Sequence, residues 1–205
     1  MKARVRFVAT GPLSPGIYNI PGRAILNVDQ TVFNGQAVFA TRTQTLSYQG
    51  ATVTVTDATC AVLPADRNLQ VALPAVLSSR FQGIGSTLGL QRFTIRVNCT
   101  AGVALHATMT DANSQANTSN ILTLAQDSTA TGVGLQISAT DRAHVVSYGA
   151  DSRVAGNNNQ WFVGGNAASP QTNHIIPFTV RYVQTAAAVQ PGTVRARSTI
   201  TFSYQ

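Results

Sequence analysis

The chain ends in the stretch Val194-Arg195-Ala196-Arg197-Ser198-Thr199-Ile200-Thr201-Phe202-Ser203-Tyr204-Gln205. Apolar and small side chains occupy the even positions, and polar or charged side chains occupy the odd positions. Successive side chains of a β-strand point to opposite faces, so this period of two predicts a strand with one buried face that continues to the terminus. An ordinary last strand of a closed sandwich has the same pattern, so the stretch by itself leaves the role of the strand open.

The same period of two recurs upstream of this stretch. Phe93, Ile95 and Val97 alternate with polar neighbours, and turn sequences rich in Gly, Pro and Asn separate such segments along the chain. Short alternating segments with frequent turns indicate an all-β sandwich or barrel. The main predicted strands cover residues 52–56, 93–98, 103–109, 132–138, 175–184 and 194–204, and polar loops are predicted at 111–120 and 151–160.

The composition also favours an all-β fold. Hydrophobic residues make up 44% of the 205 residues and charged residues only 10%, which is too apolar for a disordered chain. There is no Glu, Lys2 is the only lysine, and thirteen arginines supply most of a net charge of +7. Surface helices usually draw on Glu and Lys. The arginines are scattered singly without interleaved aromatic residues, so nucleic acid is not an expected partner.

The two cysteines, Cys60 and Cys99, are 39 positions apart. Neither has a Cys or His neighbour at a spacing typical of zinc or redox sites. We therefore predict one disulfide, which requires an oxidising compartment such as the bacterial periplasm and stabilises the fold by about 3 to 4 kcal/mol. Two buried free thiols are the alternative.

Candidate catalytic and metal-binding residues do not form a recognisable site. His106, His144 and His174 are far apart in the sequence and have no metal-ligating neighbour at a short spacing. No Gly-x-Ser-x-Gly motif is present, and Gly132-Val133-Gly134 lacks the third glycine and the following helix of a dinucleotide loop. We expect no enzyme activity, no cofactor and no metal.

Residues 1–49 are predicted to be separate from a main domain of residues 50–205. The first segment contains too little material for an independent core, and both cysteines lie beyond it. Its predicted strands are short and are interrupted by Pro and Gly turns. They cover Ala3–Val8, Gly16–Ile20, Ala24–Val28 and Gln36–Ala40.

Five motifs of the main domain resemble type 1 pilins of the chaperone-usher pathway, in their order and in their spacing. They are Thr56-Asp57-Ala58-Thr59-Cys60-Ala61-Val62, Phe93-Thr94-Ile95-Arg96-Val97-Asn98-Cys99, Gly132-Val133-Gly134-Leu135-Gln136-Ile137, Ile176-Pro177-Phe178-Thr179-Val180-Arg181-Tyr182 and Phe202-Ser203-Tyr204-Gln205. The family pattern also includes a penultimate aromatic residue, here Tyr204, and a glycine fourteen places from the end, here Gly192. The resemblance covers residues 50–205.

The resemblance implies an incomplete immunoglobulin-like sandwich that lacks its final strand and exposes a hydrophobic groove. In this family a periplasmic chaperone first supplies the missing strand, and after passage through the outer-membrane usher a neighbouring fimbrial subunit replaces it by donor-strand exchange. An added strand satisfies both the open sheet edge and the apolar pockets beside it. The residues expected at this groove are Val53, Val55, Gly192, Val194, Ala196, Ile200, Phe202, Tyr204 and Gln205.

The first 49 residues leave the role of the whole chain open. They are similar in character to the closing strands of the receptor-binding domain in two-domain tip adhesins, which would bind a host glycan or protein receptor. A late start would also explain why Met1-Lys2-Ala3-Arg4 is not followed by the apolar segment of a signal peptide. The alternative for residues 1–49 is an unusually long donor segment, as in a minor or adaptor pilin without a receptor-binding domain. A self-contained secreted carbohydrate-binding sandwich is a further alternative for the whole chain. The expected location is the extracellular fimbrium, reached through the periplasm.

Overall fold

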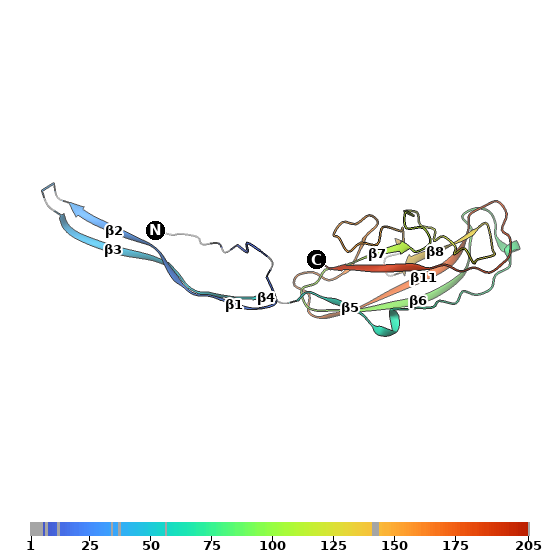
Figure 1. Ribbon diagram of the computed structural model, residues 1–205, viewed down its shortest axis with the longest axis horizontal. Helices are drawn as coiled ribbons and strands as arrows, with labels where there is room; N and C mark the ends of the chain where they lie inside the picture. Colours follow the sequence, from blue (N-terminus) through green and yellow to red (C-terminus); the bar gives the residue numbers. More distant parts are fainter. Residues whose placement is uncertain are drawn as a thin grey trace. The chain divides into compact units, whose positions relative to one another are not determined.

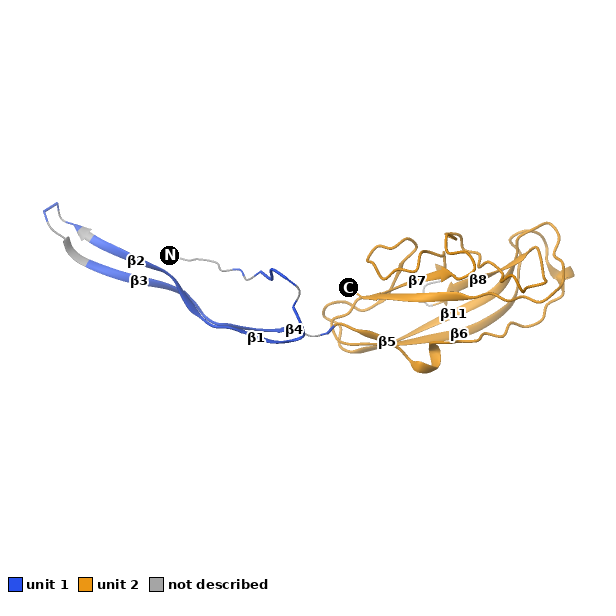
Figure 2. Cartoon of the chain, viewed as in Figure 1, with its two compact units in different colours: residues 1–57 blue, residues 58–205 orange. Residues whose placement is uncertain are grey.

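The computed structural model describes residues 6, 8–11, 13–33, 35–36, 38–55, 57–140 and 144–204, with only the backbone described at 32 and 38–40. The chain divides into two compact units, Met1–Asp57 and Ala58–Gln205, shown in Figure 2. The division falls eight residues after the boundary predicted from the sequence. Each unit is described by itself.

Unit 1 contains a long antiparallel two-stranded ribbon. β2 (Arg23–Phe33) pairs with β3 (Val38–Tyr48), and β1 (Gly16–Ile20) pairs with β4 (Ala51–Val55). The ribbon passes from one ladder to the other at Gly22 and Gly50, where a Cβ atom on Gly22 would lie 2.8 Å from the carbonyl oxygen of Tyr48. Glycine is therefore required at this point, where the two strands of the ribbon approach each other so closely.

The predicted strand Gly16–Ile20 is confirmed, but the expected short strands Ala24–Val28 and Gln36–Ala40 are wrong in extent. Residues 24–28 lie within the 11-residue β2 and residues 38–40 within the 11-residue β3, because the ladder continues through polar residues that pair across it. Gln36 precedes β3. The Thr45 hydroxyl, for example, donates to Asn27 Oδ1 at 2.9 Å. Such cross-strand bonds extend a ribbon where hydrophobic alternation gives no signal. The expected strand Ala3–Val8 falls mostly outside the described residues.

Unit 2 is a sandwich of two antiparallel sheets (Figure 1). One sheet has the order β5-β6-β11-β8-β9 and the other the order β10-β7-β12. The strands are β5 (Cys60–Val62), β6 (Thr87–Cys99), β7 (Leu105–Asp111), β8 (Val133–Ala139), β9 (His144–Val145), β10 (Trp161–Gly164), β11 (Thr172–Gln184) and β12 (Ser198–Tyr204). Two single-turn 3-10 helices, η1 (Pro64–Asp66) and η2 (Ser78–Arg80), lie between β5 and β6.

The core lies between the two sheets and is built by alternation. Inward residues of β6, β7 and β11 are buried, and Phe93 stacks on Phe178 with ring centroids 5.1 Å apart. Full burial of a large apolar side chain such as Phe178 contributes about 1.5–3 kcal/mol to the free energy of folding. The buried core residues of the three strands are Ile95, Val97, Cys99, Leu105, Ala107, Met109, Ile176, Phe178 and Val180.

The all-β sandwich predicted from the sequence is confirmed. The strands expected at 103–109, 132–138 and 175–184 correspond to β7, β8 and β11. The predicted loops 111–120 and 151–160 are without strand among their described residues, except that Asp111 ends β7. The predicted disulfide is present, with Cys60 and Cys99 directly opposite each other on β5 and β6. The strand expected at 194–204 is shorter, since β12 begins at Ser198. Among the described residues, no helix has the length and apolar character needed to cross a membrane.

Candidate functional site: an open groove between the sheets

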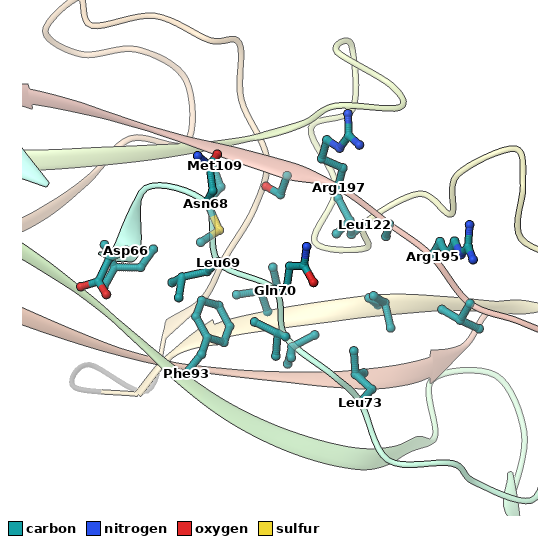
Figure 3. A pocket seen from close by; sticks show the side chains of 18 of the residues that line it. Asp66, Asn68, Leu69, Gln70, Leu73, Phe93, Met109, Leu122, Arg195 and Arg197 are labelled. Atoms are coloured by element: carbon teal, nitrogen blue, oxygen red, sulfur yellow. The ribbon is translucent and has the colours of Figure 1, made fainter. Parts of the chain in front are cut away.

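A groove of about 980 Å³ opens along one side of the sandwich, shown in Figure 3. One lip is the segment 194–198, which leads into β12. The other is the segment 66–73, which follows η1 and is called the lip segment here. The remaining lining residues are Phe93, Ile95, Met109, Leu122, Leu135, Ile137 and Val180.

The floor of the groove is the hydrophobic core itself. Ile95 and Ile137 come from one sheet and Met109 from the other, and all three are at least 94% buried. Phe93 points into the groove from β6, and Leu69 does so from the lip segment (Figure 3). Core residues of both sheets are therefore reached from a single opening, which is where a closed sandwich would have another strand.

One lip of the groove is a free strand edge. β12 is the outermost strand of its sheet among the described residues. Just before β12, the backbone of the odd-numbered residues bonds to the chain on the side away from the groove. The carbonyl of Arg197 accepts from Ala112 N at 3.1 Å, and the carbonyl of Arg195 accepts from Ala125 N at 2.7 Å. Backbone groups alternate in direction along a strand. The N–H and C=O groups of Val194 and Ala196 accordingly face the groove, and they have no hydrogen bond among the described residues.

An ion pair fixes the start of the other lip. Arg96 Nε lies 2.8 Å from Asp66 Oδ2 and Arg96 Nη2 lies 2.8 Å from Asp66 Oδ1, while Arg96 N donates to Asp66 Oδ2 at 2.9 Å. The side-chain hydrogen bonds from Arg96 hold the pKa of Asp66 below its ordinary value. Asp66 therefore stays ionised at neutral pH and anchors η1 to β6. The lip segment follows directly after η1.

A buried carboxylate shapes the wall that contains Leu122. Asp111, at the end of β7, is fully buried and accepts hydrogen bonds from Asn113 N, Asn117 Nδ2 and Thr123 N at 2.8–2.9 Å. Burial by itself raises the pKa of Asp111, but the hydrogen bonds from Thr123 and Asn117 outweigh it and lower the pKa. The bond to Thr123 N holds the backbone next to Leu122, so Asp111 positions a wall of the groove.

A smaller hollow of about 170 Å³ adjoins the groove at Val194, which lines both. Gly192 lies on its rim. A Cβ atom there would be 2.5 Å from Ala130 N and 2.5 Å from Thr129 Oγ1. Gly192 is therefore required for the close approach of the chain to residues 129–130.

Comparison with known proteins identifies the family. The sequence profile of the fimbrial protein family matches residues 47–205, which is more than half of the chain. The chain belongs to the fimbrial protein family.

Members of this family with similar sequences include adhesins. The F17c-G fimbrial adhesin of Escherichia coli is 32% identical over the whole of this chain, which spans 59% of the adhesin. The fimbrial subunit type 1 of Salmonella typhimurium is 30% identical over 78% of this chain and 82% of its own length. Among solved structures, the CupB6 tip adhesin of Pseudomonas aeruginosa has a TM-score of 0.60 at 16% identity, covering 78% of this chain and 45% of the adhesin, and it supports the fold alone.

The structure of this fimbrial protein brings some of the predicted groove residues together. Val194 and Ala196 line the groove, and Gly192 lines the adjoining hollow. Ile200 and Phe202 are partly buried against the core, further along the same face of β12. Tyr204, the last described residue of β12, is exposed, and Gln205 lies outside the described residues.

Val53 and Val55 are not among the described residues that line the groove. Both lie on β4 of unit 1, where Val53 pairs with Tyr18 and Val55 with Gly16, and the described residues that line the groove belong to unit 2. Their alternation with threonines predicted a strand correctly but did not identify its partner. The backbone pairing with β1 places them in the ribbon.

The sequence prediction missed the lip segment. Leu69, Val71 and Leu73 line the groove although the segment is not a strand. Their alternation with polar or small residues was the signal that could have located them. Among the described residues, no group of three or more His, Cys, Asp and Glu side chains could hold a metal ion.

Proposed function

We propose that the chain is a structural and adhesive subunit of a bacterial fimbria, and that a β-strand from another polypeptide fills its groove. The observation that carries this proposal is the free edge at Val194–Ser198 beside an opening onto the core. Exposed backbone groups next to uncovered apolar residues favour pairing with an added strand. The strand would complete the second sheet and exclude water from Ile95, Met109 and Ile137.

The proposed partners follow from this mechanism. A neighbouring fimbrial subunit supplies the strand in the fibre, and a periplasmic chaperone supplies one before assembly at the outer-membrane usher. The Cys60–Cys99 disulfide supports a route through an oxidising compartment to the extracellular fimbrium. The role is structural and adhesive rather than enzymatic.

Unit 1 is proposed to belong to the adhesive domain of a two-domain subunit. Two-stranded ribbons are marginally stable by themselves. This ribbon carries exposed apolar side chains, including Ile17 at 69% and Phe33 at 62% exposure. Exposed apolar side chains of this kind mark a surface that packs against another part of a domain or a partner. The similar relatives named as fimbrial adhesins are longer than this chain, which supports the same assignment; a host glycan or protein receptor is the proposed ligand.

The proposal is tested by directing the 205-residue chain to the periplasm with and without the cognate chaperone. We expect soluble 1:1 complex only with the chaperone, because the open edge otherwise aggregates. Ala196→Asp, which places a charge at the groove, should abolish the complex. Thr199→Asp on the exposed face of β12 is the matched control and should retain it. A stable, soluble monomer without the chaperone would instead indicate a self-contained sandwich.

A further inference from the structure

The lips of the groove carry positive charge that the fold does not neutralise. Arg67, Arg195 and Arg197 contribute to its lining and are exposed. Among the described residues, Asp66 is the only acidic residue of the lining, and it is bound by Arg96. Arg195 Nη1 lies 2.8 Å from Asp127 Oδ2, but the two side chains are 69% and 59% exposed. An exposed pair of this kind is weak and readily exchanged. Arg197 has no ion pair among the described residues.

The positions of Arg195 and Arg197 define a spacing. Along this stretch Val194 and Ala196 pack against the core. The side chains of Arg195 and Arg197 point away from the apolar floor of the groove (Figure 3). A strand added to this edge would place its outward side chains directly beside them. Arg195 and Arg197 are two residues apart, so the matching positions on the added strand are also two apart, whichever direction that strand runs.

From this geometry we infer that the groove selects a donor segment with two carboxylate side chains at solvent-facing positions i and i+2, between large apolar residues. The occupant is the donor segment of a neighbouring fimbrial subunit that is a different polypeptide. None of the 205 residues in this sequence supplies such a pair, because there is no Glu among them and none of the seven Asp residues are two positions apart. The inference rests on the proposed donor-strand function and specifies the partner's chemistry.

The test uses the full chain, refolded with fluorescent peptides that share one alternating apolar pattern. Three peptide series carry Asp-x-Asp, Asn-x-Asn or Lys-x-Lys at outward positions, and the pair is moved along the peptide two residues at a time. Affinity is measured by fluorescence anisotropy at low and high salt. We expect Asp-x-Asp to bind about three- to tenfold more tightly than Asn-x-Asn at one register, with Lys-x-Lys weakest. High salt should reduce the difference because exposed charges are screened.

Variants assign the effect to the arginines. Arg195→Gln combined with Arg197→Gln should bring the Asp-x-Asp and Asn-x-Asn affinities within about twofold. Arg92→Gln, an exposed arginine on the outer face of β6, is the control and should keep the preference. Equal binding of all three series by the unmodified chain would overturn charge selection and leave the donor-strand function standing. Failure of every peptide to bind would overturn both.

Discussion

At the scale of single residues, Gly192 has the tightest steric requirement at the site. A Cβ atom there would lie 2.5 Å from Ala130 N and Thr129 Oγ1, so Gly192→Ala must displace the chain beside the adjoining hollow. We expect a loss of about 1–3 kcal/mol in the free energy of unfolding, measured by urea denaturation of the chain bound to a donor peptide. Gly11→Ala, where a Cβ atom meets nothing within 4 Å, is the control. Equal stability of the two variants would contradict the steric role.

Asp111 makes the stability of unit 2 sensitive to acid. Because its pKa is lowered in the folded protein, the ionised carboxylate stabilises the fold above the unfolded pKa, and this contribution is lost as pH falls through the folded pKa. The window therefore lies below about pH 4. Asp66, whose pKa is also lowered, adds to the same acid dependence.

We expect Asp111→Asn to cost about 1–3 kcal/mol at pH 7, since both carboxylate oxygens accept from N–H groups and an amide nitrogen cannot. The variant should also lose less stability than the unmodified chain as the pH falls below about 4. Urea unfolding of the peptide-bound chain at several pH values measures both effects. Asp127→Asn, on an exposed carboxylate, is the control. An unchanged acid dependence would exclude this role for Asp111.

At the scale of elements, β5 is a three-residue strand whose attachment to β6 is reinforced by the Cys60–Cys99 disulfide. The lip segment begins shortly after this strand. We expect the Cys60→Ser and Cys99→Ser double variant to lose about 3–4 kcal/mol of stability and to bind a donor peptide more weakly. Chemical denaturation and anisotropy measure the two effects, and reduction of the unmodified protein should reproduce them. Unchanged stability would show that β5 does not depend on the cross-link.

At the scale of the whole molecule, the two units differ in how they protect their backbone. β6 and β11 each have a neighbouring strand on both sides over part of their length, and both pack on the core. Among the described residues, β2 and β3 pair only with each other. We expect amides of β1 to β4 to exchange with deuterium much faster than those of β6 and β11, because local opening of the ribbon disrupts little buried surface. Equal protection, measured by mass spectrometry on the peptide-bound chain, would mean that the ribbon is already covered.

Burial along β12 does not follow the predicted alternation to its end, because Ser203 is buried and Tyr204 is exposed. The sequence by itself did determine the strands that alternate regularly and the disulfide between its two cysteines. These properties depend on local period and composition, which need no knowledge of partners. It also placed Val194, Ala196 and Gly192 at the site through a family pattern.

Only the tertiary structure decided which strands are neighbours. Val53 and Val55 have the same alternation as a groove-lining strand, yet the backbone ladder with β1 assigns them to the ribbon. Leu69 and Val71 lie in no strand and still form a lip, because η1 and the Asp66–Arg96 pair set the path of the chain there. Pairing between distant segments is a non-local choice, so the periodicity of one segment cannot specify it.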